Sequence, residues 1–165
     1  MRRTLCAIVT LTILFCLMGC TRQEITFEKP VEVFFCQKDI AYNTDNGVIA
    51  SETWEYSNWE EKPRDFLNFY LSGTQDPDLT SPFPLGGWII KLEQTDNLAN
   101  LLVNTVFSRL SPSELTLCCA CLSMTVMELM DVDTVNIQID GTGQEVPAIT
   151  MTRDNLSFAD NALIN

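Results

Sequence analysis

Alternating apolar positions predict strands in the first third of the chain. Val31–Cys36 begins with alternation and passes into a β-branched and aromatic run, which is typical of a strand buried on both faces. Val48–Tyr56 has apolar residues near alternate positions and predicts a second extended segment. The polar segment between them ends in Asp45-Asn46-Gly47, a turn signal. We therefore expect two strands joined by a polar connection.

A first helix is predicted to begin at Pro63, because proline is favoured at the first helical position and carboxylates precede it. Apolar residues then recur at helical spacing as far as Leu71, and Gly73 is expected to end the helix in a left-handed conformation. Asp76–Gly87 contains three prolines, so we expect an ordered loop there. Trp88–Leu92 and Leu98–Val103 flank a short polar segment and predict a β-hairpin.

The clearest local signal is Ser111-Pro112-Ser113-Glu114, a capping box with proline at the first helical position. The helix that starts here is expected to be the central core helix, with Thr116, Ser123 and Glu128 on other sides of its surface. Its apolar positions follow the spacing i, i+3, i+4 and i+7: Leu115, Cys118, Cys119, Leu122, Val126, Leu129 and Met130.

Two further strands are predicted after this helix. Thr134–Asp140 alternates cleanly and is followed by the turn Gly141-Thr142-Gly143, while Pro147–Met151 predicts a short edge strand. Strands and helices in this order predict an α/β (α+β) domain.

The N-terminus has the outline of a signal peptide, with Arg2 and Arg3 before an apolar run from Thr4 to Met18. That run of about fifteen residues is shorter than the roughly twenty that a membrane-spanning helix needs, so a retained anchor is the weaker alternative. Leu17-Met18-Gly19-Cys20 resembles the lipobox of bacterial lipoproteins, which predicts lipidation of Cys20. We expect residues 1–19 to be removed, residues 20–30 to form a short tether, residues 31–156 to form the domain and residues 157–165 to be a tail.

The net charge of the chain restricts the kinds of partner that we expect it to bind. Loss of Arg2 and Arg3 with the leader changes the formal net charge from −12 to −14, which argues against nucleic acid and against a surface that lies on anionic lipid. Contact with the bilayer is therefore expected through the acyl chains on Cys20.

Four cysteines remain for the domain: Cys36, Cys118, Cys119 and Cys121. Export permits disulfides, and the pattern leaves their redox state open. The last three lie within one helical turn in an apolar run, so we expect them to be buried as small hydrophobes. The chain has no histidine, and the sequence predicts no metal site and no cofactor.

No catalytic residues are predicted. Histidine is absent, so an enzyme would depend on carboxylates such as Asp131 with Asp133, or Asp76 with Asp78. In so acidic a chain we interpret these pairs as solvated charge. Calcium binding by these loops stays open, although the sequence shows no EF-hand spacing.

Trp54, Tyr56 and Trp59 interleave with glutamates and are candidates for partner binding, by stacking on sugar rings or by anchoring a protein. The alternative is that these aromatics cover the edge of the core.

The order of these segments resembles the GerMN domain of bacterial sporulation and spore germination proteins, over about residues 30–156. The sequence segments on which this resemblance rests are Val31–Phe35, Leu71-Ser72-Gly73, Ser81–Pro84, Leu115–Leu122 with Thr125, Val132–Ile137 and Ile149–Thr152. The resemblance implies a small mixed sheet with two helices packed on one face, as in ring-building domains of sporulation assemblies. It also implies a lipoprotein that acts as an envelope assembly module, with no catalytic residues to carry over. The chain has one copy where the name-giving germination protein has two, which favours a general envelope role.

We therefore expect a membrane-anchored, extracytoplasmic, non-catalytic interaction domain whose partner is an envelope protein or peptidoglycan. A lipoprotein that binds a glycan or small ligand is the first alternative, and a carboxylate-based hydrolase is the second.

Overall fold

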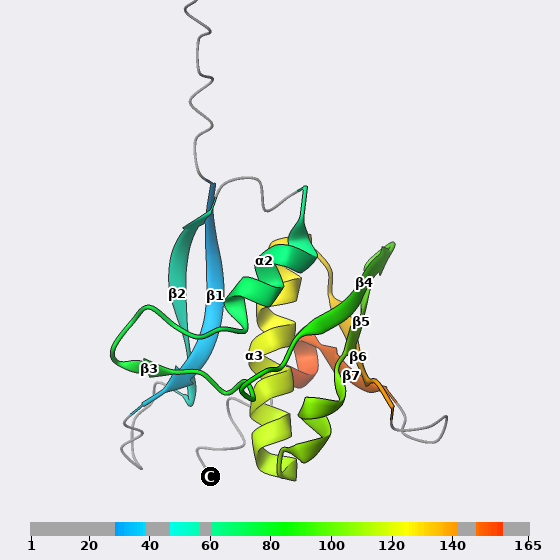
Figure 1. Cartoon of the computed structure of the whole chain (residues 1–165). Helices are drawn as coiled ribbons and strands as arrows, with labels where there is room; N and C mark the ends of the chain where they lie inside the picture. Colours follow the sequence, from blue (N-terminus) through cyan, green and yellow to red (C-terminus); the bar gives the residue numbers. More distant parts are fainter. Residues whose placement is uncertain (1–28, 39–46, 57–60, 142–147, 157–165) are drawn as a thin grey trace, which may run out of the picture.

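The computed structural model describes residues 29–38, 47–56, 61–141 and 148–156 (Figure 1). The predicted signal peptide, Cys20, Trp59 and the C-terminal tail lie outside the described residues. The elements are β1 (Lys29–Gln37), β2 (Ile49–Tyr56), α2 (Pro63–Tyr70), β3 (Leu79–Thr80), β4 (Ile89–Thr95), β5 (Leu98–Val103), the 3-10 helix η1 (Thr105–Arg109), α3 (Pro112–Met130), β6 (Thr134–Ile139) and β7 (Ile149–Thr152). The predicted α+β class is confirmed.

The first sheet has the order β2-β1-β3 and is antiparallel throughout. Val31, Val33 and Phe35 of β1 are buried, as the alternation predicted. The short strand β3 was not expected, because the sequence predicted a loop over Asp76–Gly87. It pairs with β1 only at Cys36 and Gln37. The strand therefore depends on pairing with residues about forty positions earlier in the chain.

The second sheet has the order β4-β5-β6-β7. The hairpin β4–β5 is antiparallel, as predicted, and Asp96 at its tip adopts a left-handed φ of 51°. β6 pairs parallel with β5 and antiparallel with the edge strand β7. The sheet is therefore mixed, and α3 is the crossover between its parallel strands.

Helix α3 lies between the two sheets, in contact with β1 on one side and with β6 and β7 on the other (Figure 1). The predicted capping box is present: the Ser111 side chain accepts from the Glu114 N–H, and the Glu114 carboxylate accepts from the Ser111 N–H. Ser123, expected away from the core, is fully buried, because sheets cover the helix from two sides. The helix is long and apolar enough to cross a membrane, but this is also true of core helices, and most of it is buried here.

The strands form two sheets where the resemblance implied one. Helix α2 lies between β4 and the part of β1 that β3 leaves unpaired (Figure 1), and its side chains bond the backbone of both strands. The Tyr70 hydroxyl donates to the Phe34 carbonyl of β1, and Thr125 of α3 accepts from the Phe34 N–H at 3.0 Å. Asn68 bonds Ile89 of β4. These side chains take the place of a neighbouring strand.

Candidate functional site

Two open pockets lie at the surface where α2 meets β4, and Arg64 lines both of them. We call the two together the α2–β4 groove. One part, of about 490 Å³, lies near the start of α2, and the other, of about 660 Å³, lies near the start of β4. The first part is lined by Glu61, Lys62, Pro63, Arg64, Asp65, Lys91, Leu92, Gln94 and Met130. The second is lined by Arg64, Asn68, Gly87, Trp88, Ile89 and Ile90.

The groove is held in shape by hydrogen bonds from α2 to the β4 backbone. The Asn68 Oδ1 accepts from the Ile89 N–H at 2.7 Å, and its Nδ2 donates to the Ile89 carbonyl at 3.2 Å. Arg64 reaches the Ile90 carbonyl at 3.5 Å. At the far end of β4, Gln94 donates to the Met130 carbonyl at 3.3 Å, which ties the strand to the end of α3. These bonds hold the backbone of the edge strand at both of its ends.

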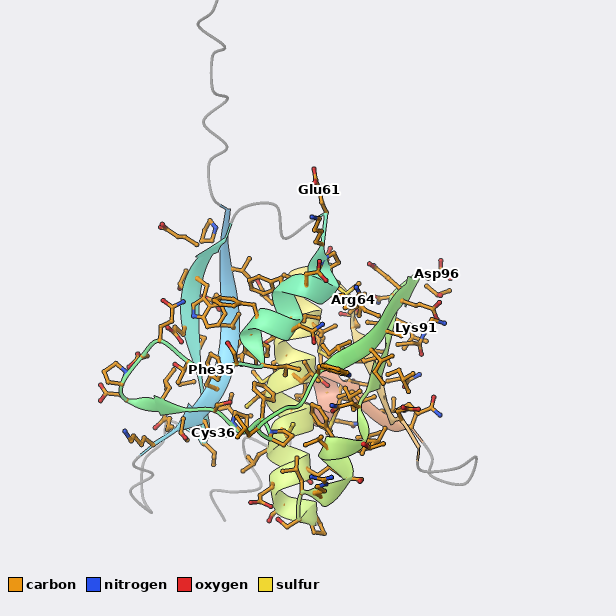
Figure 2. The ribbon with its side chains drawn as sticks, in the orientation of Figure 1. Phe35, Cys36, Glu61, Arg64, Lys91 and Asp96 are labelled. Atoms are coloured by element: carbon orange, nitrogen blue, oxygen red, sulfur yellow. The ribbon has the colours of Figure 1, made fainter. Side chains whose placement is uncertain are left out.

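Charged side chains of both signs line this groove, in a chain whose formal net charge is −12. The first part is lined by Lys62, Arg64 and Lys91 against two carboxylates, Glu61 and Asp65. Figure 2 shows Arg64 on α2 and Lys91 on β4 on the same side of the molecule, with Glu61 at the start of α2. Arg64 pairs with Asp65 at 3.4 Å, and Lys91 pairs with a neighbouring glutamate at 2.8 Å. Both cations keep more than half of their side-chain surface exposed.

Large apolar side chains are exposed next to these cations. Trp88 is 59% exposed and Ile90 is 37% exposed, whereas Ile89 between them is buried. Sequence reasoning assigned all three to a strand without separating its two faces. The sequence did contain a signal, the continuous apolar run Trp88-Ile89-Ile90. Where one face of a sheet packs on the core and the other is solvated, such a run leaves alternate apolar side chains exposed. The register shift between Ile89 and Lys91 turns this end of the strand.

Gly87 lets the chain enter β4 beneath Trp88. A β-carbon at this position would come within 2.9 Å of the Phe107 ring and 3.0 Å of the Pro84 carbonyl. Phe107, from η1, is almost completely buried. The floor of the groove therefore rests directly on the core.

Of the three aromatic residues predicted for partner binding, the structure describes the side chain of Trp54. Trp54 is only 5% exposed, and its ring lies 5.4 Å from Phe69 and 6.1 Å from both Phe66 and Tyr70. Trp54 therefore fits the alternative prediction, in which these aromatic residues cover the edge of the core. The side chain of Tyr56 and the whole of Trp59 lie outside the described residues, so their role in partner binding stays a prediction.

Two of the four carboxylates considered for catalysis, Asp133 and Asp76, have structural partners. Asp133 accepts from Arg153 Nε at 2.8 Å and from the Asn97 amide, and these bonds hold the pKa of its carboxyl below the ordinary value. Asp131 ends α3 in a left-handed conformation. Asp76 accepts from the Asp78 N–H at 2.8 Å, which closes a local turn. None of these four carboxylates lines the α2–β4 groove.

The four domain cysteines are buried, as expected for the three on α3. Burial raises the pKa of Cys118 far above the ordinary value and that of Cys119 to about 12, so neither is a thiolate at neutral pH. Within the part of the chain that the structure describes, no group of three His, Cys, Asp or Glu side chains is placed to hold a metal ion.

Comparison with known proteins identifies the fold. No protein-family model and no curated protein matches the sequence. The first GerMN domain of the sporulation protein GerM from Bacillus subtilis matches with a TM-score of 0.56 and 13% identity, over 76% of this chain and 98% of that one. The tandem GerMN domains of the same protein match with a TM-score of 0.55 and 18% identity, over 82% of this chain. This chain spans about half of the tandem structure, at 48%.

A protein from Clostridium perfringens described as a candidate lipoprotein matches with 12% identity, over 79% of this chain and 91% of that one. Its TM-score of 0.43 is too low to support an argument. The two stronger matches confirm the resemblance to GerMN domains at the level of the fold.

Proposed function

We propose that this GerMN-fold chain is an extracytoplasmic lipoprotein whose domain is a non-catalytic assembly module of the cell envelope, in sporulation or germination complexes or a related role. The fold shared with GerMN domains of a sporulation protein supports the assembly role. The short apolar leader and Leu17-Met18-Gly19-Cys20 support export and lipidation at Cys20.

The docking site in this proposal is the α2–β4 groove, and its occupant is an acidic, extended segment of an envelope protein. The observation that carries the proposal is the exposed pair Trp88 and Ile90 beside Arg64 and Lys91 on an otherwise acidic chain. Exposed aromatic surface with arginine next to it is typical of binding hot spots. Complementary charge would select an acidic segment and repel a second acidic domain.

Anchoring is tested by mass spectrometry of the chain purified from membranes. The expected product begins at Cys20 and carries acyl chains, and Cys20→Ala moves the protein out of the membrane fraction. A chain that keeps Met1, or an unmodified Cys20 thiol, would contradict the proposed anchoring without bearing on the groove.

Docking is tested with a photocrosslinking residue at Trp88 in the full chain in its native membrane. The matched control carries the same residue at Glu128, which is exposed on α3 away from the groove lining. We expect a specific adduct from position 88 alone, lost in an Arg64→Glu, Lys91→Glu variant and weakened by salt. The captured protein is then titrated in purified form against the wild type and the charge-reversed variant, with a fall in affinity of at least tenfold expected.

Equal adducts from both positions, or affinity unaffected by charge reversal, would rule out docking in this groove. An adduct of twice the chain mass would instead identify a second copy as the occupant and reject the acidic partner. The glycan-binding alternative is weaker, because Trp54 is buried and both parts of the groove are open.

A further inference from the structure

Two cysteines from distant parts of the chain meet in the core. Cys36, at the end of β1, and Cys121, on α3, have their sulfur atoms 4.0 Å apart, and 85 residues separate them in the sequence. Figure 2 shows Cys36 near the lower end of β1, below Phe35. Both side chains are buried, with Cys36 6% exposed and Cys121 fully enclosed.

The contact between the two sulfur atoms follows from how β1 is aligned along α3. The Phe34 N–H donates to Thr125 Oγ1 at 3.0 Å. From Phe34 to Cys36 the strand advances about 6.6 Å, and from Thr125 back to Cys121 the helix covers about 6.0 Å. The two advances match, so the Phe34–Thr125 bond also brings the two sulfur atoms together.

The backbone at Cys36 is held from both sides, because it pairs with Ile49 of β2 and with Thr80 of β3. A disulfide needs an S–S distance near 2.05 Å, so the sulfur atoms must approach by roughly 2 Å from their present separation of 4.0 Å. We infer that Cys36 and Cys121 form a disulfide when the chain meets a disulfide oxidant. The inference depends on the proposed function only for export, which would bring the chain to an oxidising compartment.

The chemistry is two thiol–disulfide exchanges with a disulfide-bearing oxidant, such as a thiol–disulfide oxidoreductase or oxidised glutathione. Cys36 loses its proton and attacks one oxidant sulfur, which forms a mixed disulfide and releases the first oxidant thiolate. Cys121 loses its proton and attacks the Cys36 sulfur, which closes the bridge and releases the second. The two thiols give up two protons and two electrons, and the oxidant disulfide becomes two thiols.

The order of attack follows from the surroundings of the two sulfur atoms. A hydrogen bond from Cys121 lowers the pKa of Cys36, while the contact with Cys36 and burial raise the pKa of Cys121. Cys36 is also the more exposed of the two, so it is the first nucleophile.

The first test maps thiols in the full chain, refolded with oxidised and reduced glutathione, then denatured, alkylated and digested. We expect one linked peptide that joins Cys36 to Cys121, about 2 Da lighter than the two thiol peptides together, with Cys118 and Cys119 alkylated. Alkylation of both Cys36 and Cys121, or linkage of Cys36 to Cys118, would overturn the inference.

Matched variants make the test independent of one substitution. Cys118→Ala, one helical turn away, should keep the linked peptide, and its urea midpoint should fall when reductant is added, as in the wild type. Cys36→Ala should lose both the link and the response to reductant. A midpoint of the wild type that ignores reductant would count against the bridge.

The same mapping on full chain purified from its native membrane separates this inference from the proposed function. A bridge after glutathione treatment but free thiols in the native material would leave the pairing intact and contradict export to an oxidising compartment. Membrane-anchored material that stays reduced even with glutathione would reject the pairing and leave the anchoring intact.

Discussion

Helices α3 and α2 differ in how they begin and in what holds them. A side-chain cap that is visible in the sequence begins α3, whereas α2 has no such cap and is bonded to both sheets. The capping box of Ser111 and Glu114 marks the start of α3, and its middle is enclosed by both sheets. No side chain caps the start of α2, which relies on Pro63 and on bonds from Tyr70 and Asn68 to two different sheets.

The two helices also differ in how the core covers them. Most of α3 from Cys118 to Leu129 is buried in the core, so substitutions of these buried residues act on the whole fold. Helix α2 buries Phe66, Leu67 and Tyr70 on one side and presents Arg64 to the groove on the other. The proposed docking groove is thus lined by the helix that has no side-chain cap at its start and that bonds both sheets.

The largest expected effect is at the centre of α3. Leu122 is fully buried, so Leu122→Ala should lower the free energy of unfolding by about 2–5 kcal/mol, from lost burial and the cavity left behind. Urea unfolding measures this. Leu85→Ala is the control, because Leu85 is fully exposed and its loss should change stability by less than about 0.5 kcal/mol. Similar losses for both variants would contradict the central place of α3.

The counterpart on α2 is Asn68. Asn68→Ala removes both bonds to buried Ile89, so we expect a loss of about 1–3 kcal/mol from unsatisfied backbone groups. Hydrogen exchange should report faster exchange at the Ile89 amide, with less change in the middle of α3. Uniform loss of protection across both helices would show that α2 and α3 do not open separately.

A smaller effect is expected at the start of α3. Ser111→Ala removes the side chain that accepts from the Glu114 N–H, and loss of such a cap costs about 1 kcal/mol. Lys62→Ala is the matched substitution at the start of α2, where no side-chain cap exists, and should change stability less. Thermal unfolding of the two variants side by side decides whether the cap accounts for the contrast.

The smallest effect is a pH dependence confined to α3. Bonds to Ser111 lower the pKa of Glu114 in the folded chain. Its stabilising contribution is therefore complete above the unfolded pKa of about 4.3 and is lost as pH falls through the folded pKa. Glu114→Gln should reduce the acid-side slope of the urea midpoint between pH 7 and about pH 2. An unchanged slope would mean that this carboxylate does not stabilise the helix.

Local signals were the predictable part of the fold. The capping box, the alternation in β1 and β6 and the hairpin β4–β5 each lie within a few neighbouring residues, and each prediction was confirmed. The strand β3, the burial of Ser123 and the division into two sheets arise from contacts between segments far apart in the chain. Periodicity within one segment contains no information about them.

The groove was not predictable for the same reason. It joins Arg64 and Asn68 to Trp88 and Lys91, which lie at least twenty residues further along the chain. The sequence pattern of aromatic residues among acidic ones favoured Trp54 as a binding residue, but its side chain is buried in the core. Trp88 directly precedes β4, and its exposure depends on which face of the sheet the rest of the fold covers.

The parallel pairing of β5 with β6 has a consequence for how quickly the domain folds. Leu98 pairs with Thr134, 36 residues later, whereas β4 and β5 are neighbours in the chain. Hairpins and helices form within microseconds, but a parallel pair must first close the long loop between its strands. Until α3 has docked, β5 offers a free edge to any other chain, so slow maturation of this helix would expose newly made protein to aggregation.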